Sequence, residues 1–300
     1  MKHNGRILSV SLTILFAIAV SGVLLFTTAR PQMTTDEQLM AWMTEINSKL
    51  EASGQDLRVD YAEYLTEDSS AAIGRTVFFN DRGNKQLSSH FVPGDPRRGG
   101  RTNITYMVDQ TEGAIDGLTV AQTTAAIDRA MNTWNSQTCS VIPITKLAAP
   151  NVDLGVVEFQ NGLGGIGAFF ADITHAGWLP GGILSNNVIG VTFTFVWVSG
   201  GVPTDINNDG KTDTAFREIL YNNAFTWRIN NNIDVETVAF HESGHALSQG
   251  HFGTAFTTGN GKLHFAPLAV MNAAYSGVQQ SPRGTDNGGH CSIWASWPNK

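Results

Sequence analysis

The sequence has little charge, little cysteine and no excess of basic residues. Only 15% of its 300 residues are charged, and 26 acidic residues against 19 lysines and arginines give a formal net charge of −7. A nucleic-acid-binding protein needs a clustered basic face, so this composition excludes nucleic acid as an expected partner. The hydrophobic fraction of 42% suffices to bury a core, which excludes a globally disordered chain. The 31 glycines disfavour a bundle of long helices.

Two cysteines, Cys139 and Cys291, are all that the chain contains. They are too far apart for the closely spaced cysteines of a zinc ribbon or a redox motif. In an oxidising compartment an even pair is expected to form one disulfide, which here would tie an early part of the main domain to its C-terminal end. The alternative is a pair of buried thiols.

One long apolar run lies near the N-terminus, and no later segment resembles a membrane span. Lys2 and Arg6 precede the uncharged residues 7–26, and small residues follow. This pattern predicts that residues 1–30 are a secretory signal peptide. The same run is long enough to cross a bilayer, so an uncleaved membrane anchor formed by residues 7–26 is the alternative. Both interpretations place most of the chain outside the cytoplasm, as a secreted or extracytoplasmic protein, with membrane contact through this segment alone.

Chain-breaking residues divide the remainder of the sequence. The segment 92–101 is rich in proline, glycine and arginine, and it has the composition of a solvated linker. We therefore expect an N-terminal accessory or propeptide-like region at residues 31–96 and a main domain at residues 97–300.

Hydrophobic periodicity predicts helices interspersed with strands. The expected helices are 36–52, 118–134 and 234–248. The expected strands are 57–64, 76–79, 103–108, 156–159, 191–198 and 216–221. A capping box of Thr35 with Gln38, and the caps Thr119 and Asp234, are expected to begin the helices. The last fifty residues should be mostly irregular, so the chain is expected to be an α/β protein with helices packed on a mixed sheet.

The last expected helix carries the sequence His241-Glu242-Ser243-Gly244-His245. Residues four apart share one face of a helix, so both imidazoles can bind one metal ion. Glu242 lies beside them and can accept a proton from water, which is the arrangement of a catalytic zinc site. A motif this short also arises by chance, in which case the helix carries two ordinary histidines.

A catalytic zinc needs a third protein ligand, and the candidates are few. No glutamate follows Glu242, which excludes a downstream glutamate ligand. The remaining candidates are His251, His264, Asp286 and His290. We favour His251, ten residues after His241, because a sharp turn past the helix end would return its ring to the metal. Asp286 is the second choice.

The pattern His241-Glu242-x-x-His245-x-x-Ser248-x-x-His251 resembles the extended zinc signature of the metzincin metallopeptidases, and it is most similar to that of the matrixins. Ser248 stands where the family has a glycine, and a non-glycine residue adopts positive φ at a modest cost. The segment 269–275 resembles the methionine turn of the family. The resemblance implies that Met271 forms an apolar floor under the ligands.

Tyr275 follows this methionine by four residues. The resemblance gives it the role of presenting its hydroxyl to a substrate oxyanion, and a packed core tyrosine is the alternative.

The resemblance extends over residues 100–300 and implies a metzincin-like catalytic domain. Such a domain has a mixed, mostly parallel twisted sheet, an active-site helix and an irregular C-terminal subdomain. Residues 97–300 would then be a zinc metallopeptidase domain that cleaves protein or peptide substrates outside the cytoplasm, with Glu242 as general base. Two alternatives stay open: a non-catalytic zinc- and calcium-stabilised extracellular binding module, and a zinc hydrolase of non-protein amides. The sequence makes no prediction of oligomeric state.

A second metal site is suggested by the segment 205–213, which reads Asp-Ile-Asn-Asn-Asp-Gly-Lys-Thr-Asp. Oxygen donors at positions 1, 3, 5 and 9, with glycine at position 6, match the first part of a calcium loop. Position 12 is Phe216 and not glutamate, which excludes a complete EF-hand. The candidate calcium ligands are Asp205, Asn207, Asp209 and Asp213. The other interpretation is an ordinary turn rich in Asn, Asp and Gly.

Overall fold

The computed structural model describes residues 33–68, 72–80 and 89–299 of the chain. The signal peptide or membrane anchor expected at residues 1–30 lies outside the described residues. Within the described ranges, no helix is both long enough and apolar enough to cross a membrane.

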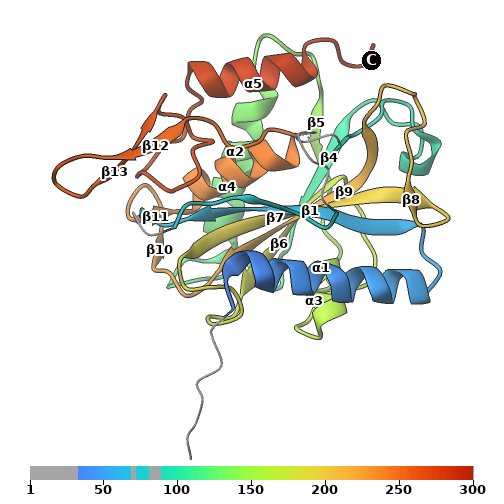
Figure 1. Ribbon diagram of the computed structural model, residues 1–300, viewed down its shortest axis with the longest axis horizontal. Helices are drawn as coiled ribbons and strands as arrows, with labels where there is room; N and C mark the ends of the chain where they lie inside the picture. Colours follow the sequence, from blue (N-terminus) through green and yellow to red (C-terminus); the bar gives the residue numbers. More distant parts are fainter. Residues whose placement is uncertain (1–32, 69–71, 81–88, 300) are drawn as a thin grey trace, which may run out of the picture. The chain divides into compact units, whose positions relative to one another are not determined.

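Helices are interspersed among runs of strands along the described chain (Figure 1). The helices are α1 (Thr35–Ala52), the 3-10 helix η1 (Pro96–Arg98), α2 (Val120–Asn135), α3 (Val156–Asn161), α4 (Val235–Ala246) and α5 (Gly284–Trp294). The strands of the first half are β1 (Leu57–Thr66), β2 (Thr76–Phe78), β3 (Ser89–His90), β4 (Ile104–Val108) and β5 (Ile144–Lys146). Those of the second half are β6 (Ile173–Leu179), β7 (Val188–Ser199), β8 (Val202–Pro203), β9 (Thr212–Asn222), β10 (Trp227–Arg228), β11 (Ile233–Asp234), β12 (Thr254–Thr257) and β13 (Leu263–Ala266).

A mixed central sheet organises the described residues. Its main path runs β2-β1-β7-β9-β6-β4-β5. The strands from β9 to β5 are parallel to one another, whereas β9–β7, β7–β1 and β1–β2 are antiparallel pairs. This confirms the expected α/β fold with a mixed sheet, and it confines the parallel arrangement to one half of that sheet.

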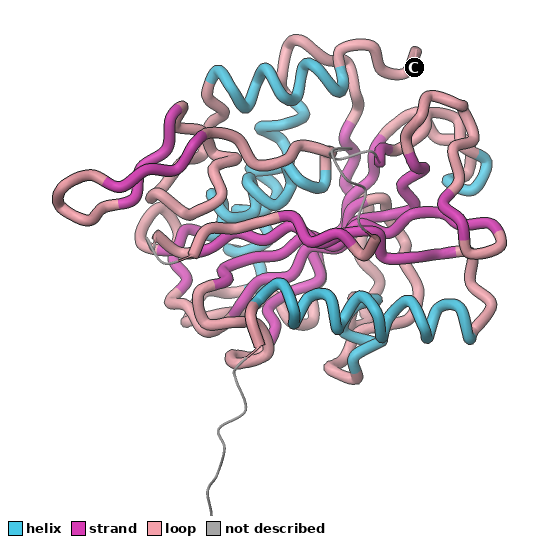
Figure 2. Tube along the Cα trace, viewed as in Figure 1, coloured by secondary structure: helices cyan, strands magenta, loops and turns pink. Residues whose placement is uncertain are grey.

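Helices cover both faces of the sheet (Figure 2). Helices α1 and α3 pack on one face of the sheet. Helix α1 contributes a buried stripe formed by Leu39, Met43, Ile46 and Leu50. On the other face lie α2, α4 and α5, and their core contains several tryptophans. The indole of Trp134 on α2 donates a hydrogen bond of 2.9 Å to the carbonyl oxygen of Phe240 on α4. The helix that carries the histidine motif is therefore held between the sheet and α2.

The helix caps follow the expected chemistry with one shift in register. Thr119 and Asp234 accept hydrogen bonds from the first turns of α2 and α4, as predicted. The capping box of α1 is formed by Thr34 with Glu37. The prediction of Thr35 with Gln38 was wrong by one residue, because Thr34 and Glu37 bond each other's backbone amides and the Gln38 side chain instead donates to the Ile183 carbonyl oxygen.

The expected division at residue 97 is wrong. Strand β1 lies inside the sheet between β2 and β7, and the residues from Met33 onward form one compact unit. The segment 92–101 is not a solvated linker, because Arg98 in η1 is buried and its Nε donates to Asp172 at 2.8 Å. A region that supplies an internal strand is a part of the same fold as the rest of the chain.

The strand expected at 156–159 is the helix α3. The Glu218 carboxylate on β9 accepts hydrogen bonds from the amides of Val156 at 2.7 Å and Val157 at 2.9 Å. These amides begin α3, so a buried carboxylate 61 and 62 residues further along the chain supplies the cap that favours a helix here. This long-range contact has no signal in the local sequence.

Most of the last fifty residues are irregular, as expected, but three regular elements lie among them. These are the strands β12 and β13, whose hairpin projects from the rest of the fold in Figure 1, and the helix α5. Helix α5 carries Cys291, whose disulfide to Cys139 confirms the predicted pairing. The disulfide and the buried Trp294 attach α5 to the core next to α2.

Replacing Glu158 with glutamine should stabilise the protein in alkaline solution. Burial first, and then the nearby carboxylates, with Glu218 foremost, raise the pKa of Glu158 to about 9. The folded state keeps a proton that the unfolded chain releases near the ordinary pKa, so the free energy of unfolding of the wild type falls between those two pKa values. Glutamine does not ionise, so the variant should be more stable than the wild type by about 1–3 kcal/mol at about pH 8.

Urea unfolding of both proteins at about pH 5 and about pH 8 measures this difference. The advantage of the variant should be smaller at the lower pH. Equal pH dependence of the two proteins would show that Glu158 ionises normally in the folded state.

Candidate metal centre

Three histidines meet at the end of α4. The Nε2 atoms of His241 and His245 are 3.0 Å apart, those of His245 and His251 are 3.1 Å apart, and those of His251 and His241 are 3.3 Å apart. Among the described residues, these three make up the only group of three or more His, Cys, Asp or Glu whose ligand atoms all lie within 4.8 Å of one another. The structure thus brings together the three residues that the motif predicted.

Backbone carbonyls fix which nitrogen faces the centre. Nδ1 of His241 donates to the Val270 carbonyl oxygen at 2.6 Å, and Nδ1 of His245 donates to the Gln249 carbonyl oxygen at 2.8 Å. With Nδ1 protonated, the neutral ring presents the lone pair of Nε2. Lone pairs converging at about 3 Å repel one another unless a cation lies between them, so this group could hold a metal ion.

The electrostatic surroundings differ among the three rings. Burial and the neighbouring histidines lower the pKa values of His241 and His251 well below the usual range. Burial is the largest single effect on His245 and opposes its charged form, but the carboxylates of Glu63 and Glu242 and the Gln249 carbonyl together raise the pKa of His245. Oε1 of Glu63 lies 3.2 Å from Nδ1 of His245, and both side chains are fully buried. The neutral rings of His241 and His251 are the form that binds metals.

A tight turn after α4 returns the chain to the centre. The Ser248 amide bonds to the His245 carbonyl oxygen at 2.8 Å, and the Gln249 amide bonds to that of Gly244 at 2.9 Å. These are the two hydrogen bonds of a Schellman motif. Ser248 occupies its left-handed position with φ of 67°. The turn therefore forms without the glycine of the matrixin pattern, and it carries His251 to the other two rings.

The segment around Met271 packs against α4 and supports the histidine ligands. A Cβ atom at Gly244 would overlap Sδ of Met271, so a glycine at this position lets the buried Met271 pack directly on the helix. The carbonyl of Val270, in the same turn, orients His241. The carboxylate of Asp286 accepts from the amides of Val270 at 3.0 Å and Met271 at 3.1 Å. Asp286, the second choice as a third ligand, thus fixes the turn and does not join the histidines.

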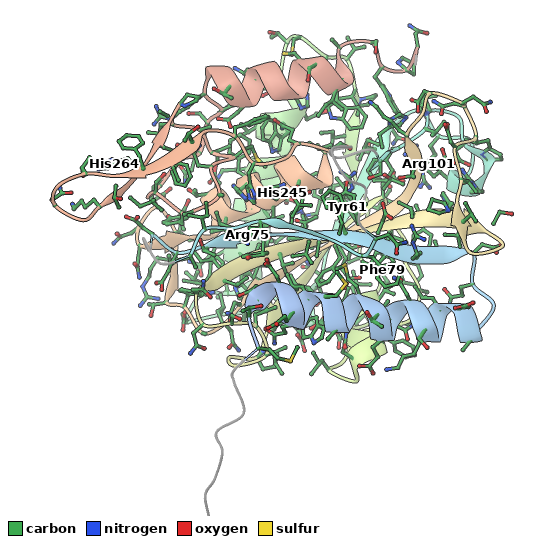
Figure 3. All side chains as sticks on the ribbon, viewed as in Figure 1. Tyr61, Arg75, Phe79, Arg101, His245 and His264 are labelled. Atoms are coloured by element: carbon green, nitrogen blue, oxygen red, sulfur yellow. A yellow bond between two sulfur atoms is a disulfide. The ribbon has the colours of Figure 1, made fainter. Side chains whose placement is uncertain are left out.

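The other candidate ligands lie elsewhere. His290 is buried against Trp134, and its Nε2 is 3.0 Å from the Ser140 hydroxyl. His264 lies on β13 of the projecting hairpin, well separated from His245 in Figure 3.

Glu242 points one carboxylate oxygen at the sheet and leaves the other without a partner. Oε2 accepts a hydrogen bond of 2.6 Å from the Thr192 hydroxyl on β7, and Oε1 has no hydrogen-bond partner in the described part of the chain. Burial raises the pKa of Glu242 to about 7, although the charge of His245 and the Thr192 hydrogen bond lower it. A Cβ atom at Gly190 on β7 would come within 2.9 Å of Oε1, so the glycine there makes room for the carboxylate.

The hydroxyl of Tyr275 is bonded within the protein, which favours the packed core tyrosine over the oxyanion donor that the family resemblance implied. Its hydroxyl donates to the Asn232 carbonyl oxygen at 2.6 Å and accepts from the Asp234 amide at 3.1 Å. Both partners belong to the start of α4. The buried tyrosine therefore anchors the N-terminus of that helix to the segment that follows Met271.

The segment 205–213 forms a turn whose acidic side chains are already bonded. Asp205 accepts from the amides of Asp209 at 3.1 Å and Gly210 at 2.8 Å. The Asp213 carboxylate is buried against Arg97, at 2.7 Å. Asp213 therefore does not join Asp205, Asn207 and Asp209, and the hydrogen bonds among the first residues of the segment are those of an Asx-stabilised turn. Calcium binding by this segment stays a prediction.

The sequence did not identify two residues that contact the centre, Thr192 and Glu63. The position of Thr192 on the polar side of the clearest alternating strand was a weak indication of its role. No local pattern indicated the role of Glu63, because only the pairing of β1 with β7 brings it to α4.

Comparisons with known proteins do not name a family for this chain. No protein-family model matches it, and no curated protein matches it. The function therefore has to be inferred from the residues of the centre themselves.

The turn at Ser248 gives a direct test of this geometry. Ser248→Gly should raise the free energy of unfolding by about 0.5–1 kcal/mol, because glycine relieves the left-handed conformation and this gain exceeds its larger unfolded-state entropy. Ser248→Val should lower it by about 1 kcal/mol or more, because a β-branched residue disfavours positive φ. Chemical denaturation of the three proteins measures both changes. A glycine variant no more stable than the valine variant would contradict the turn.

Proposed function

We propose that the protein is an extracytoplasmic zinc-dependent endopeptidase of the metzincin type, most similar to the matrixins. One observation carries the proposal. Three Nε2 atoms converge within 3.3 Å beside a glutamate, Glu242, that has one carboxylate oxygen without a partner among the described residues. This is the set of groups that metal-assisted hydrolysis requires.

Zinc is the metal that fits this donor set best. Three neutral imidazoles suit a borderline-soft ion, and tetrahedral Zn–N bonds of about 2.0–2.1 Å put the ligand nitrogens about 3.3 Å apart. The observed separations of 3.0, 3.1 and 3.3 Å are close to that value. Three protein ligands leave a fourth position open, which is typical of catalytic and not of structural zinc sites.

The protein's own contribution to the reaction comes from Glu242. Zinc supplies a Lewis acid and lowers the pKa of water towards 7. Glu242 holds the attacking water through Oε1, accepts its proton, and passes that proton to the leaving amine. Thr192 fixes the other oxygen, so the carboxylate keeps its orientation through the reaction.

Local features of the matrixin pattern support the peptidase proposal over the alternatives. Ser248 accomplishes the turn that glycine makes in the family, and Met271 packs on α4 beside the ligands. A binding module without catalysis would not need Glu242. The disulfide of Cys139 with Cys291 supports location in an oxidising, extracytoplasmic compartment.

Glu242→Gln tests the proposed role of the carboxylate. The variant keeps the size of the side chain and the three histidines, so it should still bind one zinc ion per chain. It cannot accept a proton, so its rate of cleavage of a fluorescently labelled unfolded protein should fall by about 10²- to 10⁴-fold. Metal analysis and the cleavage assay are done on the same preparation.

Glu236→Gln is the matched control, because Glu236 lies on the same helix and pairs with Arg129 away from the histidines. It should cleave at close to the wild-type rate. Cleavage by Glu242→Gln at the wild-type rate would refute the assigned role. A wild-type protein that binds zinc, leaves polypeptides intact and hydrolyses a small N-acyl amide would favour the non-protein amide hydrolase.

A further inference from the structure

A charged side chain from outside the signature motif reaches the metal centre. Glu63 lies on β1, in the region expected to be accessory. Its Oε1 is 3.2 Å from Nδ1 of His245. That nitrogen lies on the side of the ring opposite the Nε2 atom that faces the other two histidines. Glu63 therefore contacts the metal centre from behind one of its ligands.

Strand register explains why Glu63 reaches α4. Glu63 pairs with Thr192 on β7 and with Thr76 on β2. Paired residues of antiparallel strands project from the same face of the sheet. Thr192 bonds Glu242 on α4, and the Thr76 hydroxyl donates to Oε1 of Glu63 at 3.2 Å. A row of polar side chains thus crosses three strands and faces α4.

A second row of polar side chains on the sheet contacts the backbone of His245. Arg217 on β9 pairs with Thr194 on β7, which pairs with Tyr61 on β1. Arg217 donates to the His245 carbonyl oxygen at 2.5 Å and to the Tyr61 hydroxyl at 3.2 Å. Strand β1 therefore contacts the imidazole ring of His245 through Glu63, and β9 contacts its carbonyl group through Arg217, which Tyr61 of β1 supports.

The cost of burying Glu63 indicates that its contact with His245 is more than packing. Burying a carboxylate is unfavourable unless hydrogen bonds or a nearby positive charge replace the lost contacts with water. Oε2 of Glu63 has no hydrogen-bond partner among the described residues. A metal on Nε2 adds positive charge to the imidazole ring, and a carboxylate oxygen 3.2 Å from Nδ1 stabilises that charge while the Nδ1–H donates to the Gln249 carbonyl oxygen. Metal binding at one nitrogen and the carboxylate at the other thus reinforce each other.

We propose that Glu63 is a positioning residue of the metal centre, whose carboxylate orients the ring of His245 and strengthens the binding of zinc at Nε2. The Gln249 carbonyl oxygen contacts the same Nδ1, so His245 has one neutral and one charged partner. His241 has the Val270 carbonyl oxygen at this place. The inference rests on the proposed zinc site and is independent of peptide hydrolysis.

The zinc dissociation constant of Glu63→Gln tests the inference. Glutamine keeps the shape of the side chain and a partner for Thr76 but removes the charge. Competition with a chromophoric chelator at fixed pH should show zinc binding about 10- to 100-fold weaker than in the wild type, the range expected for loss of such an outer partner. Circular dichroism and thermal unfolding of the metal-free proteins establish that both are folded.

Glu67→Gln is the matched control, since Glu67 follows β1 directly and its side chain is exposed. Its zinc dissociation constant should stay within about twofold of the wild type. Glu63→Asp keeps the charge but withdraws it from Nδ1, so it should also weaken zinc binding, and it decides the question if the glutamine variant does not fold.

Folded Glu63→Gln that binds zinc as tightly as the wild type overturns the positioning role and leaves the proposed function standing. A wild-type protein that binds no zinc overturns both.

Discussion

Three imidazole nitrogens held about 3 Å apart are the constraint on which the rest of the site depends. Such a convergence is unfavourable in a metal-free core and favourable around a cation. Several neighbouring features keep the three nitrogens in this arrangement. The helix α4 sets His241 and His245 on one face, the turn at Ser248 returns His251, and the segment of Met271 supports the helix from below.

The sheet takes part in the centre as directly as the helix does. Polar residues on β1, β7 and β9 contact Glu242 and the imidazole ring and carbonyl group of His245. Apolar neighbours pack around them on the same face of the sheet. Since β1 is an internal strand, the N-terminal region cannot leave without opening the sheet beside the metal ligands. This favours a permanent structural role for that region over the propeptide-like role that its sequence also suggested.

Sequence reasoning succeeded where the determinants are close together in the chain. The spacing of His241, His245 and His251 defines a helix face and a turn, and the strand and helix periodicities are local. The disulfide was predicted because the chain has two cysteines and a predicted export signal. Reasoning failed where a distant charge decides the outcome. Glu218 caps α3, Arg97 takes the carboxylate of Asp213 away from the supposed calcium loop, and Glu63 meets His245 only through strand pairing.

X-ray absorption at the zinc edge, on protein purified without chelators, tests the central claim most directly. The account predicts one zinc per chain, bound to three imidazole nitrogens at about 2.0–2.1 Å and to one oxygen from solvent. The absence of bound zinc after zinc is supplied, or a first shell containing fewer than three imidazoles, would contradict it.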